Sequence, residues 1–186
     1  MGQDKALLEI DGETLTARAM RTLGHVCGSV TLVFNAEQSI DTDLPYVRDE
    51  FPGRGALGGL HAALKSSRAR IAVVLAVDLP LVSPEAVANL VSLADSLPKF
   101  LAVVPRQTDG RAQPLFAAYR PRFCLPHIES VIATDPRASV RDFLDRIGPK
   151  FIDPSKLSTD PNLLANVNTP EDFAKIIRDP GSHSRG

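Results

Sequence analysis

The chain has 186 residues, of which 44% are hydrophobic and 23% are charged, and its formal net charge is -1. This composition is typical of a single globular domain and excludes a strongly basic nucleic-acid or membrane surface. The longest apolar run, residues 71–77, is far shorter than the roughly 20 residues that a membrane helix needs. Cys27 and Cys124 stand alone without metal-ligand spacing, so we expect reduced cysteines in a cytoplasmic protein.

The first half of the chain alternates between helical and strand patterns. Leu15, Ala19 and Leu23 lie four residues apart and predict a helix over 14–23. An apolar, β-branched run over 30–34 predicts a strand, and Tyr46 with Val47 predicts a weaker one. After the loop DEFPGRG at 49–55, helical spacing resumes over 56–65.

The run IAVVLAV at 71–77 is apolar at every position and ends at Asp78. Such a run predicts a strand that is buried on both faces, in the middle of a parallel sheet. Ser83 and Pro84 then supply an N-cap and a first helical position for a helix that reaches about residue 93.

The second half continues in the same way. We expect a strand at 100–104, followed by a hairpin with Asp109-Gly110 at its tip and QPLFAAY as its returning arm. Helices are predicted at 121–133 and 139–147. A last helix follows Thr169 as N-cap, with Asp172 completing a capping-box variant. Residues 179–186 have no apolar side chains to bury and are predicted to be a disordered tail.

This alternation predicts one α/β domain over residues 1–178, with a mostly parallel sheet and helices on both of its faces. In open sheets of this class, ligands bind outside the carboxyl ends of the strands. The residues that follow predicted strands are therefore the first candidates for a functional site.

Asp78 is the strongest of these candidates, because a carboxylate at the end of a buried strand can hold a hard cation together with substrate phosphates. The alternative is that Asp78 only caps the turn that follows it. Lys5 is a second candidate for phosphate binding, although a lone lysine is usually a solvated surface charge.

The remaining candidates are glycines and polar residues at strand ends. Glycines surround the start of the helix at 56–65, where free backbone N–H groups can receive an anion, or where small residues simply permit tight packing. Polar residues end the first two predicted strands and precede the last predicted helix. The alternative for each of them is that it only forms a turn. These residues are Gly53, Gly55, Gly58, Gly59, Asn35, Asp49, Asn166 and Asn168.

Five segments in order, MGQDKALLEIDG, RGALGGLHAAL, VVLAVDLPLVS, AQPLFAAY and NVNTPEDF, resemble the molybdenum cofactor guanylyltransferases. The resemblance runs from Met1 to about Ile177 and implies a three-layer, Rossmann-like nucleotidyltransferase fold. The related cytidylyltransferases differ before the signature lysine, in the glycine loop and after the strand-end aspartate. Asp4-Lys5, the glycine segment 55–59 and Asp78-Leu79-Pro80 are more similar to the guanylyl branch.

The resemblance implies a role for each candidate. Asp78 would hold Mg²⁺, and Lys5 would neutralise the phosphates, so that both are catalytic. Asn35 and Asp49 match positions that contact the guanine nucleotide, and Gly55 and Gly58 belong to the wall of the base site. Asn166 and Asn168 match a segment that faces the pterin.

The implied reaction is attack by the terminal phosphate of molybdenum-bound molybdopterin on the α-phosphorus of GTP, which gives the guanine dinucleotide cofactor and pyrophosphate. Two alternatives remain at this point. In the first alternative, the chain is a cytidylyltransferase that uses CTP. In the second, it is a catalytically impaired homologue that binds the pterin or serves as a scaffold. Implied partners are GTP, molybdopterin, and other proteins of molybdenum cofactor synthesis or acceptor enzymes, with no nucleic acid or membrane.

The resemblance also carries an expectation about the start of the chain. Relatives place a strand and a glycine-rich turn of the type LAGGxSxRMG before the signature lysine, and only Met1-Gly2 correspond to it here. We therefore expect the sequence to lack an N-terminal segment that supplies an inner strand and phosphate-binding backbone groups.

Overall fold

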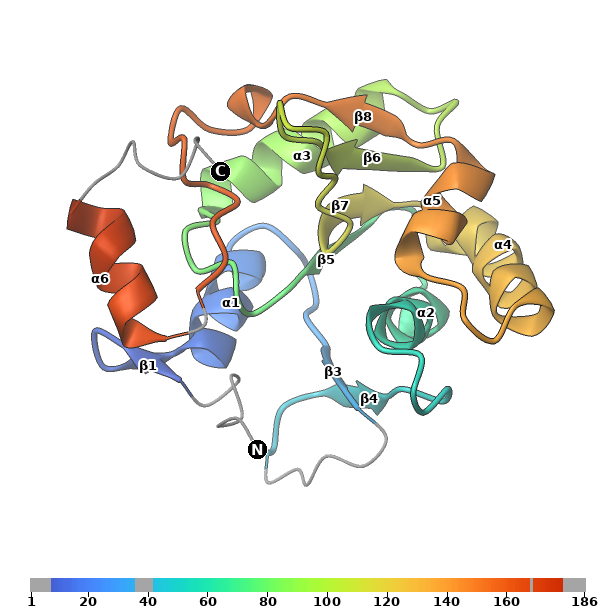
Figure 1. The fold of residues 1–186 in the computed structure, drawn as a ribbon, viewed down its shortest axis with the longest axis horizontal. Coiled ribbons are helices and arrows are strands. Elements are labelled where there is room, and N and C mark those ends of the chain that lie inside the picture. The colour runs from blue at the N-terminus through green and yellow to red at the C-terminus, as the bar shows by residue number, and fades with distance from the viewer. Residues whose placement is uncertain (1–7, 36–41, 168, 179–186) are drawn as a thin grey trace.

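A computed structural model describes residues 8–35, 42–167 and 169–178 (Figure 1). Its short strands at Glu9–Ile10, Glu13–Thr14 and Lys150–Ile152 were not predicted from the sequence. In chain order the elements are β1 (Glu9–Ile10), β2 (Glu13–Thr14), α1 (Leu15–Gly24), β3 (Leu32–Phe34), β4 (Tyr46–Arg48), α2 (Ala56–Ser66), β5 (Ala72–Leu75), α3 (Pro84–Ser96), β6 (Ala102–Pro105), β7 (Phe116–Tyr119), α4 (Pro121–Thr134), α5 (Val140–Ile147), β8 (Lys150–Ile152), the 3-10 helix η2 (Pro154–Lys156) and α6 (Pro170–Arg178).

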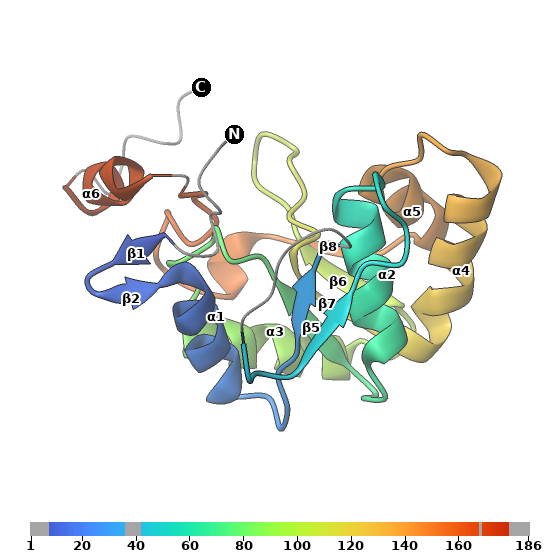
Figure 2. The same cartoon turned by 90° about the horizontal axis from the view of Figure 1, so that it is seen from below.

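The central sheet has the strand order β5-β7-β6-β8. Strands β5, β6 and β8 run in one direction, and β7 runs antiparallel to β5 and β6. The α/β class is thus confirmed, and the sheet is mixed because the hairpin between β6 and β7 turns the chain straight back. Strands β3 and β4 form a separate parallel pair, which stands apart from the central sheet in Figure 1, and Figure 2 shows the same elements from below.

Helices cover both faces of the central sheet. On β7, Ala117 and Tyr119 pack with residues of α2, α4 and α5, whereas Phe116 and Ala118 pack with residues of α3. Successive side chains of a strand point to opposite faces, so this alternation builds two cores, one above and one below the sheet. Figure 1 shows α4 and α5 on one side of the strands and α1 and α3 on the other. The predicted three-layer arrangement is confirmed.

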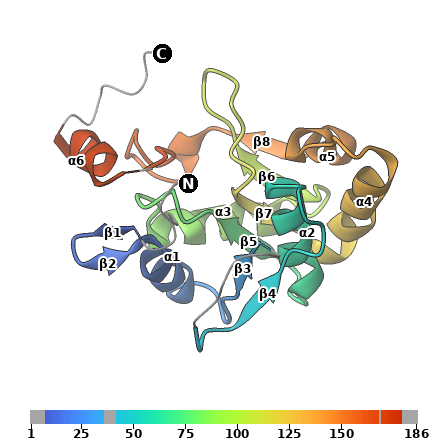
Figure 3. The same ribbon diagram turned by 60° about the horizontal axis from the view of Figure 1, so that its bottom comes forward.

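A third apolar cluster joins the two ends of the chain. Ile10 and Leu15 pack there with Val167 and Phe173, and Val77 lies against them. Figure 3 shows the β1–β2 hairpin, α1 and α6 together at one end of the molecule. The cluster therefore ties residues just before Asp78 to the segment that precedes α6.

Strand β5 departs from the sequence prediction. It ends at Leu75, earlier than expected, and residues 71–78 are only partly buried. The prediction of a strand between parallel neighbours is wrong, because β5 pairs with the antiparallel β7 and its other flank opens on a cavity that β3 also lines. Asp78 consequently lies in a turn after the strand, where Leu79 N donates to Ala76 O over 3.3 Å.

The predicted helix starts are confirmed by their caps. Thr14 accepts from Ala17 N, Ser83 accepts from Ala86 N, and Thr169 exchanges hydrogen bonds with Asp172. Such caps satisfy backbone N–H groups that have no partner inside the helix. None of the helices in the described part of the chain is long and apolar enough to cross a membrane.

The predicted β6–β7 hairpin is also confirmed. Gln107 N donates to Arg111 O over 2.9 Å, and the Asp109 carboxylate accepts from Arg111 N. Gly110 takes a φ of +87°, which glycine adopts without steric cost. The residues of the expected disordered tail lie outside the described part of the chain.

Substitution of Tyr119 tests the hydrogen bond that holds the end of the β6–β7 hairpin against β7. Its buried hydroxyl donates to Pro114 O over 2.7 Å and fixes the turn that leads into β7. Tyr119→Phe leaves that carbonyl without its buried donor, so we expect the free energy of unfolding to fall by about 1 kcal/mol in urea denaturation. The control Tyr46→Phe, at a residue that is 46% exposed, should change it much less. Equal effects of the two substitutions would contradict this role.

Candidate active site

A cavity of about 540 Å³ lies between β3 and β5, and its lining includes four of the candidate residues from the sequence, Asn35, Gly55, Gly59 and Asp78. Asn35 follows β3, Gly55 precedes α2, and Asp78 follows β5. The rest of the lining is mostly apolar and comes from α1, α2, β3 and β5. A concave apolar site with a few polar groups at its rim is the usual form of a small-molecule pocket.

Asp78 is held next to the segment before α6. Val167 N donates to the backbone O of Asp78 over 2.8 Å, and Val167 itself is buried in the cluster that includes Val77. Asn166 precedes Val167 and is exposed. The structure therefore brings Asp78 and Asn166 together, although 88 residues separate them in the chain (166 minus 78). Asn168 lies outside the described residues.

Asp49 has a different environment from the other strand-end residues. Asp49 N donates to Phe34 O over 2.8 Å, so Asp49 follows β4 directly beside the end of β3. Its side chain is only 5% exposed and accepts from Phe51 N over 2.7 Å. It does not line the cavity, because the carboxylate lies beneath the first turn of α2, against Gly58.

The glycine loop is shaped by two positions. Gly55 has a φ of +52° and is the N-cap of α2, with no side chain to bond the free N–H groups of the first turn. Gly55, Ala56 and Gly59 line the cavity, so the positive end of the helix dipole lies beside it. Gly58 is required for another reason, since a Cβ there would overlap the Asp49 carboxylate.

Arg54 anchors this loop, although it was not among the residues predicted from the sequence. Its Nη2 donates to Asp135 O over 2.6 Å and to Ile132 O over 3.4 Å at the end of α4. A charged residue inside a glycine-rich loop was the only signal in the sequence. Its partners lie about 80 residues away and were not predictable from local pattern.

The residues around Asp78 fit a magnesium ion that is held mainly by its substrate. Within the described ranges there is no group of three or more His, Cys, Asp or Glu side chains that could form a complete metal cage. Magnesium commonly binds through one or two carboxylates, several waters and substrate phosphates, so a single carboxylate at the cavity rim suits it. Lys5 lies outside the described residues.

Comparison with known proteins identifies the family. A family model described as the MobA-like NTP transferase domain matches residues 1–150. The molybdenum cofactor guanylyltransferase of Rhizobium johnstonii is 31% identical, over 96% of this chain and 86% of its own length. A Carboxydothermus hydrogenoformans protein named "Probable molybdenum cofactor guanylyltransferase" is 30% identical, over 96% of this chain and 89% of its own length.

A solved structure shows the same fold. The molybdopterin-guanine dinucleotide biosynthesis protein A from Archaeoglobus fulgidus superimposes with a TM-score of 0.73 and 22% identity. The match covers 94% of this chain and 89% of that one. The Rossmann-like nucleotidyltransferase fold that the resemblance implied is therefore confirmed.

Two neighbouring glycines test the packing of the glycine loop. Gly58→Ala forces its methyl group into the fixed Asp49 carboxylate, and we expect the free energy of unfolding to fall by about 1–3 kcal/mol. Gly59→Ala is the matched control, because its methyl group would meet only Val33 at 3.9 Å. In the helix interior this second change should be neutral or stabilise by up to about 1 kcal/mol. Thermal and urea unfolding measure the stability of both variants. A Gly59→Ala chain that is less stable than Gly58→Ala would contradict the contact between Gly58 and the Asp49 carboxylate.

Proposed function

The chain belongs to the family of MobA-like NTP transferases, and on that premise we propose that it transfers GMP from GTP to molybdenum-bound molybdopterin. The products are the molybdopterin guanine dinucleotide and pyrophosphate. The observation that carries the proposal is the placement of Asn35, Gly55 and Asp78 around one cavity at the ends of β3 and β5. The names of the relatives support the choice of guanine over cytosine.

The nucleotide would lie along the rim of the cavity, on the side of β3. Asn35 offers an amide that both donates and accepts, as a base or ribose requires. Gly55 and Gly59 let a planar ligand approach the backbone of α2. Asp49 would support this site indirectly, because its backbone N donates to Phe34 O at the end of β3 and its carboxylate packs against Gly58 of α2.

The triphosphate would lie toward Asp78, whose carboxylate holds Mg²⁺ in this proposal. Asp78 would hold the ion there, and the chemistry that magnesium would supply is neutralisation of negative charge on the phosphates. Lys5 would add a second positive charge there.

The acceptor would approach from the side of Asn166, which the Val167–Asp78 hydrogen bond holds beside the turn. Asn168 belongs to the same segment and is proposed to share this role. The phosphate of the acceptor is already an anion, so no proton has to be removed before it attacks. Its oxygen forms a bond to the α-phosphorus of GTP while the bond from that phosphorus to pyrophosphate breaks.

A reaction of this kind depends on alignment and on charge neutralisation rather than on a general base. The chain's own contribution is then to hold two anionic substrates in line across the end of β5. Asp78 is the residue on which both substrates converge in this arrangement.

Asp78→Asn tests the proposal, because it keeps the size of the side chain and removes the charge that would hold magnesium. We expect the rate of guanine dinucleotide formation to fall by at least about a hundredfold. The rate is measured by chromatography of the released cofactor. Asp145→Asn, an exposed carboxylate on α5, should leave the rate unchanged. Circular dichroism and thermal unfolding confirm that both variants fold. A folded Asp78→Asn chain that retains activity within tenfold of the parent would rule out this role.

A further inference from the structure

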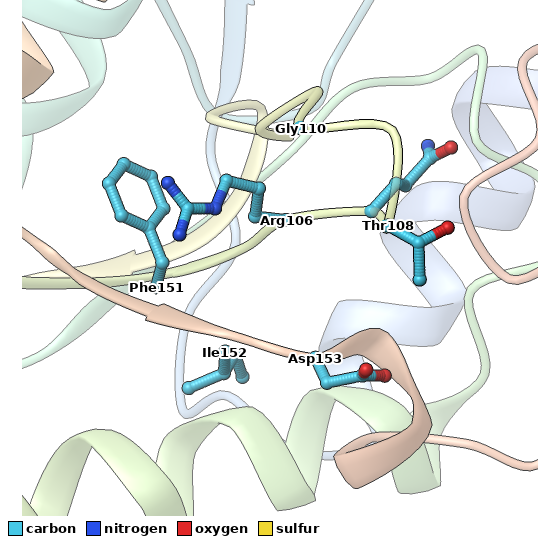
Figure 4. A pocket seen from close by; sticks show the side chains of 7 residues that line it. Arg106, Thr108, Gly110, Phe151, Ile152 and Asp153 are labelled. Atoms are coloured by element: carbon cyan, nitrogen blue, oxygen red, sulfur yellow. The ribbon is translucent and has the colours of Figure 1, made fainter.

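A second cavity, of about 380 Å³, lies between the β6–β7 hairpin and the end of β8. We call it the hairpin groove. Figure 4 shows its lining residues. The Arg106 guanidinium lies beside Phe151, and the Asp153 carboxylate lies apart from it, beyond Ile152. The hairpin contributes Arg106, Thr108 and Gly110, and the other wall consists of Phe151, Ile152 and Asp153.

The hairpin groove opens on the same edge of the central sheet as Asp78. Strands β6 and β8 are parallel and end there at Pro105 and Ile152. The last residue of β5, Leu75, pairs with Phe116 at the start of β7, which places the end of β5 on that edge too. With strands about 4.8 Å apart, the ends of β6 and β8 stand about 10 and 14 Å from the end of β5.

Arg106 is held in place without an acidic partner. Its guanidinium lies over the Phe151 ring, 4.2 Å from the ring centroid, and its backbone N donates to Ile152 O over 2.9 Å. Within residues 8–35, 42–167 and 169–178, no carboxylate forms an ion pair with it. A guanidinium that contacts an aromatic ring still has N–H groups available, and their fork matches the oxygens of a phosphate.

Asp153 supplies the opposite chemistry. Its carboxylate accepts from Ser155 N over 2.8 Å, and it is exposed to the groove. Hydrogen bonds from Ser155 and the nearby charge of Lys156 keep the pKa of Asp153 below its usual range. The group is therefore an anion at neutral pH and can only accept hydrogen bonds. Its remaining lone pairs can pair with two adjacent N–H donors of a ligand.

The groove thus offers a phosphate-binding cation on the β6 side and an acceptor of N–H groups on the β8 side. A pterin with a phosphate arm carries the complementary groups, since its 2-amino-4-oxopyrimidine ring presents N–H donors at adjacent positions. We propose that the hairpin groove binds the pterin of the acceptor substrate, with Asp153 accepting from its ring N–H groups and Arg106 directing its phosphate toward Asp78. This inference rests on the proposed function and adds where the acceptor lies.

Fluorescence titration of the folded chain with 6-hydroxymethylpterin and with 6-hydroxymethyllumazine tests the role of Asp153. Lumazine has a carbonyl in place of the 2-amino group, which turns one N–H pairing into repulsion by the carboxylate. We expect the pterin to bind at least about tenfold more tightly, which corresponds to one lost charged hydrogen bond. In Asp153→Asn this preference should disappear, whereas Asp145→Asn should retain it. Asparagine also caps a helical turn well, so the fold should be preserved.

Arg106 is tested with the same pterin carrying a phosphate on its hydroxymethyl group. The parent chain should bind the phosphorylated form more tightly than the free alcohol, and Arg106→Gln should reduce that gain by about tenfold. Arg111→Gln is the matched control on the same hairpin, because Arg111 is already paired with Asp109 over 2.6 Å. An equal loss in both variants would mean that only the general charge of the hairpin matters, and would overturn the assignment of Arg106.

Parallel calorimetric titrations with GTP separate this inference from the proposed function. Loss of pterin preference in Asp153→Asn with unchanged GTP affinity supports the hairpin groove as the acceptor site. A chain that prefers the pterin through Asp153 but binds no GTP would keep this inference and remove the proposed function. Product formation together with an unchanged pterin preference in Asp153→Asn would overturn this inference alone.

Discussion

The position of β7 between β5 and β6 is the constraint on which the rest of the structure depends. Because β7 pairs antiparallel with both neighbours, β5, β6 and β8 all run in one direction and end on the same edge of the sheet. The turn with Asp78 and the hairpin groove therefore face the same side. The short β6–β7 hairpin creates this arrangement, because it returns the chain without a crossover helix.

Packing on both faces of the sheet then fixes the polar residues of the edge. Alternate side chains of β6 and β7 fill two separate cores, so a shift of register by one residue would exchange them. A third cluster around Val167 holds Asn166 next to Asp78, and the Arg54 bonds to α4 hold the glycine loop. Along the edge, the cavity beside β5 is followed by Asp78, Arg106 and Asp153, in the strand order from β5 to β8.

Local pattern was sufficient where one element carries its own signal. Ser83-Pro84 and Thr169 marked helix starts through their caps, and Asp109-Gly110 marked the hairpin. Pattern failed for β5, because an apolar run records burial and not the direction of its neighbours. It also failed for β8, whose three residues are too short for a period. Asp49 stays a predicted site residue, and only the tertiary structure shows that its carboxylate is buried beneath α2. The pairing of Arg106 with Phe151 required tertiary structure.

The two proposals together give one arrangement, in which the nucleotide binds beside the end of β5 and the acceptor binds at the end of β8. Amide chemical shifts of the isotope-labelled chain, recorded during titration with GTP and Mg²⁺, test it most directly. We expect saturable shifts at Asn35, Gly55 and the turn around Asp78, with small changes at Thr108 and Asp153, and weaker binding of CTP. Shifts centred on the hairpin groove, or a folded chain that responds equally to CTP, would contradict it.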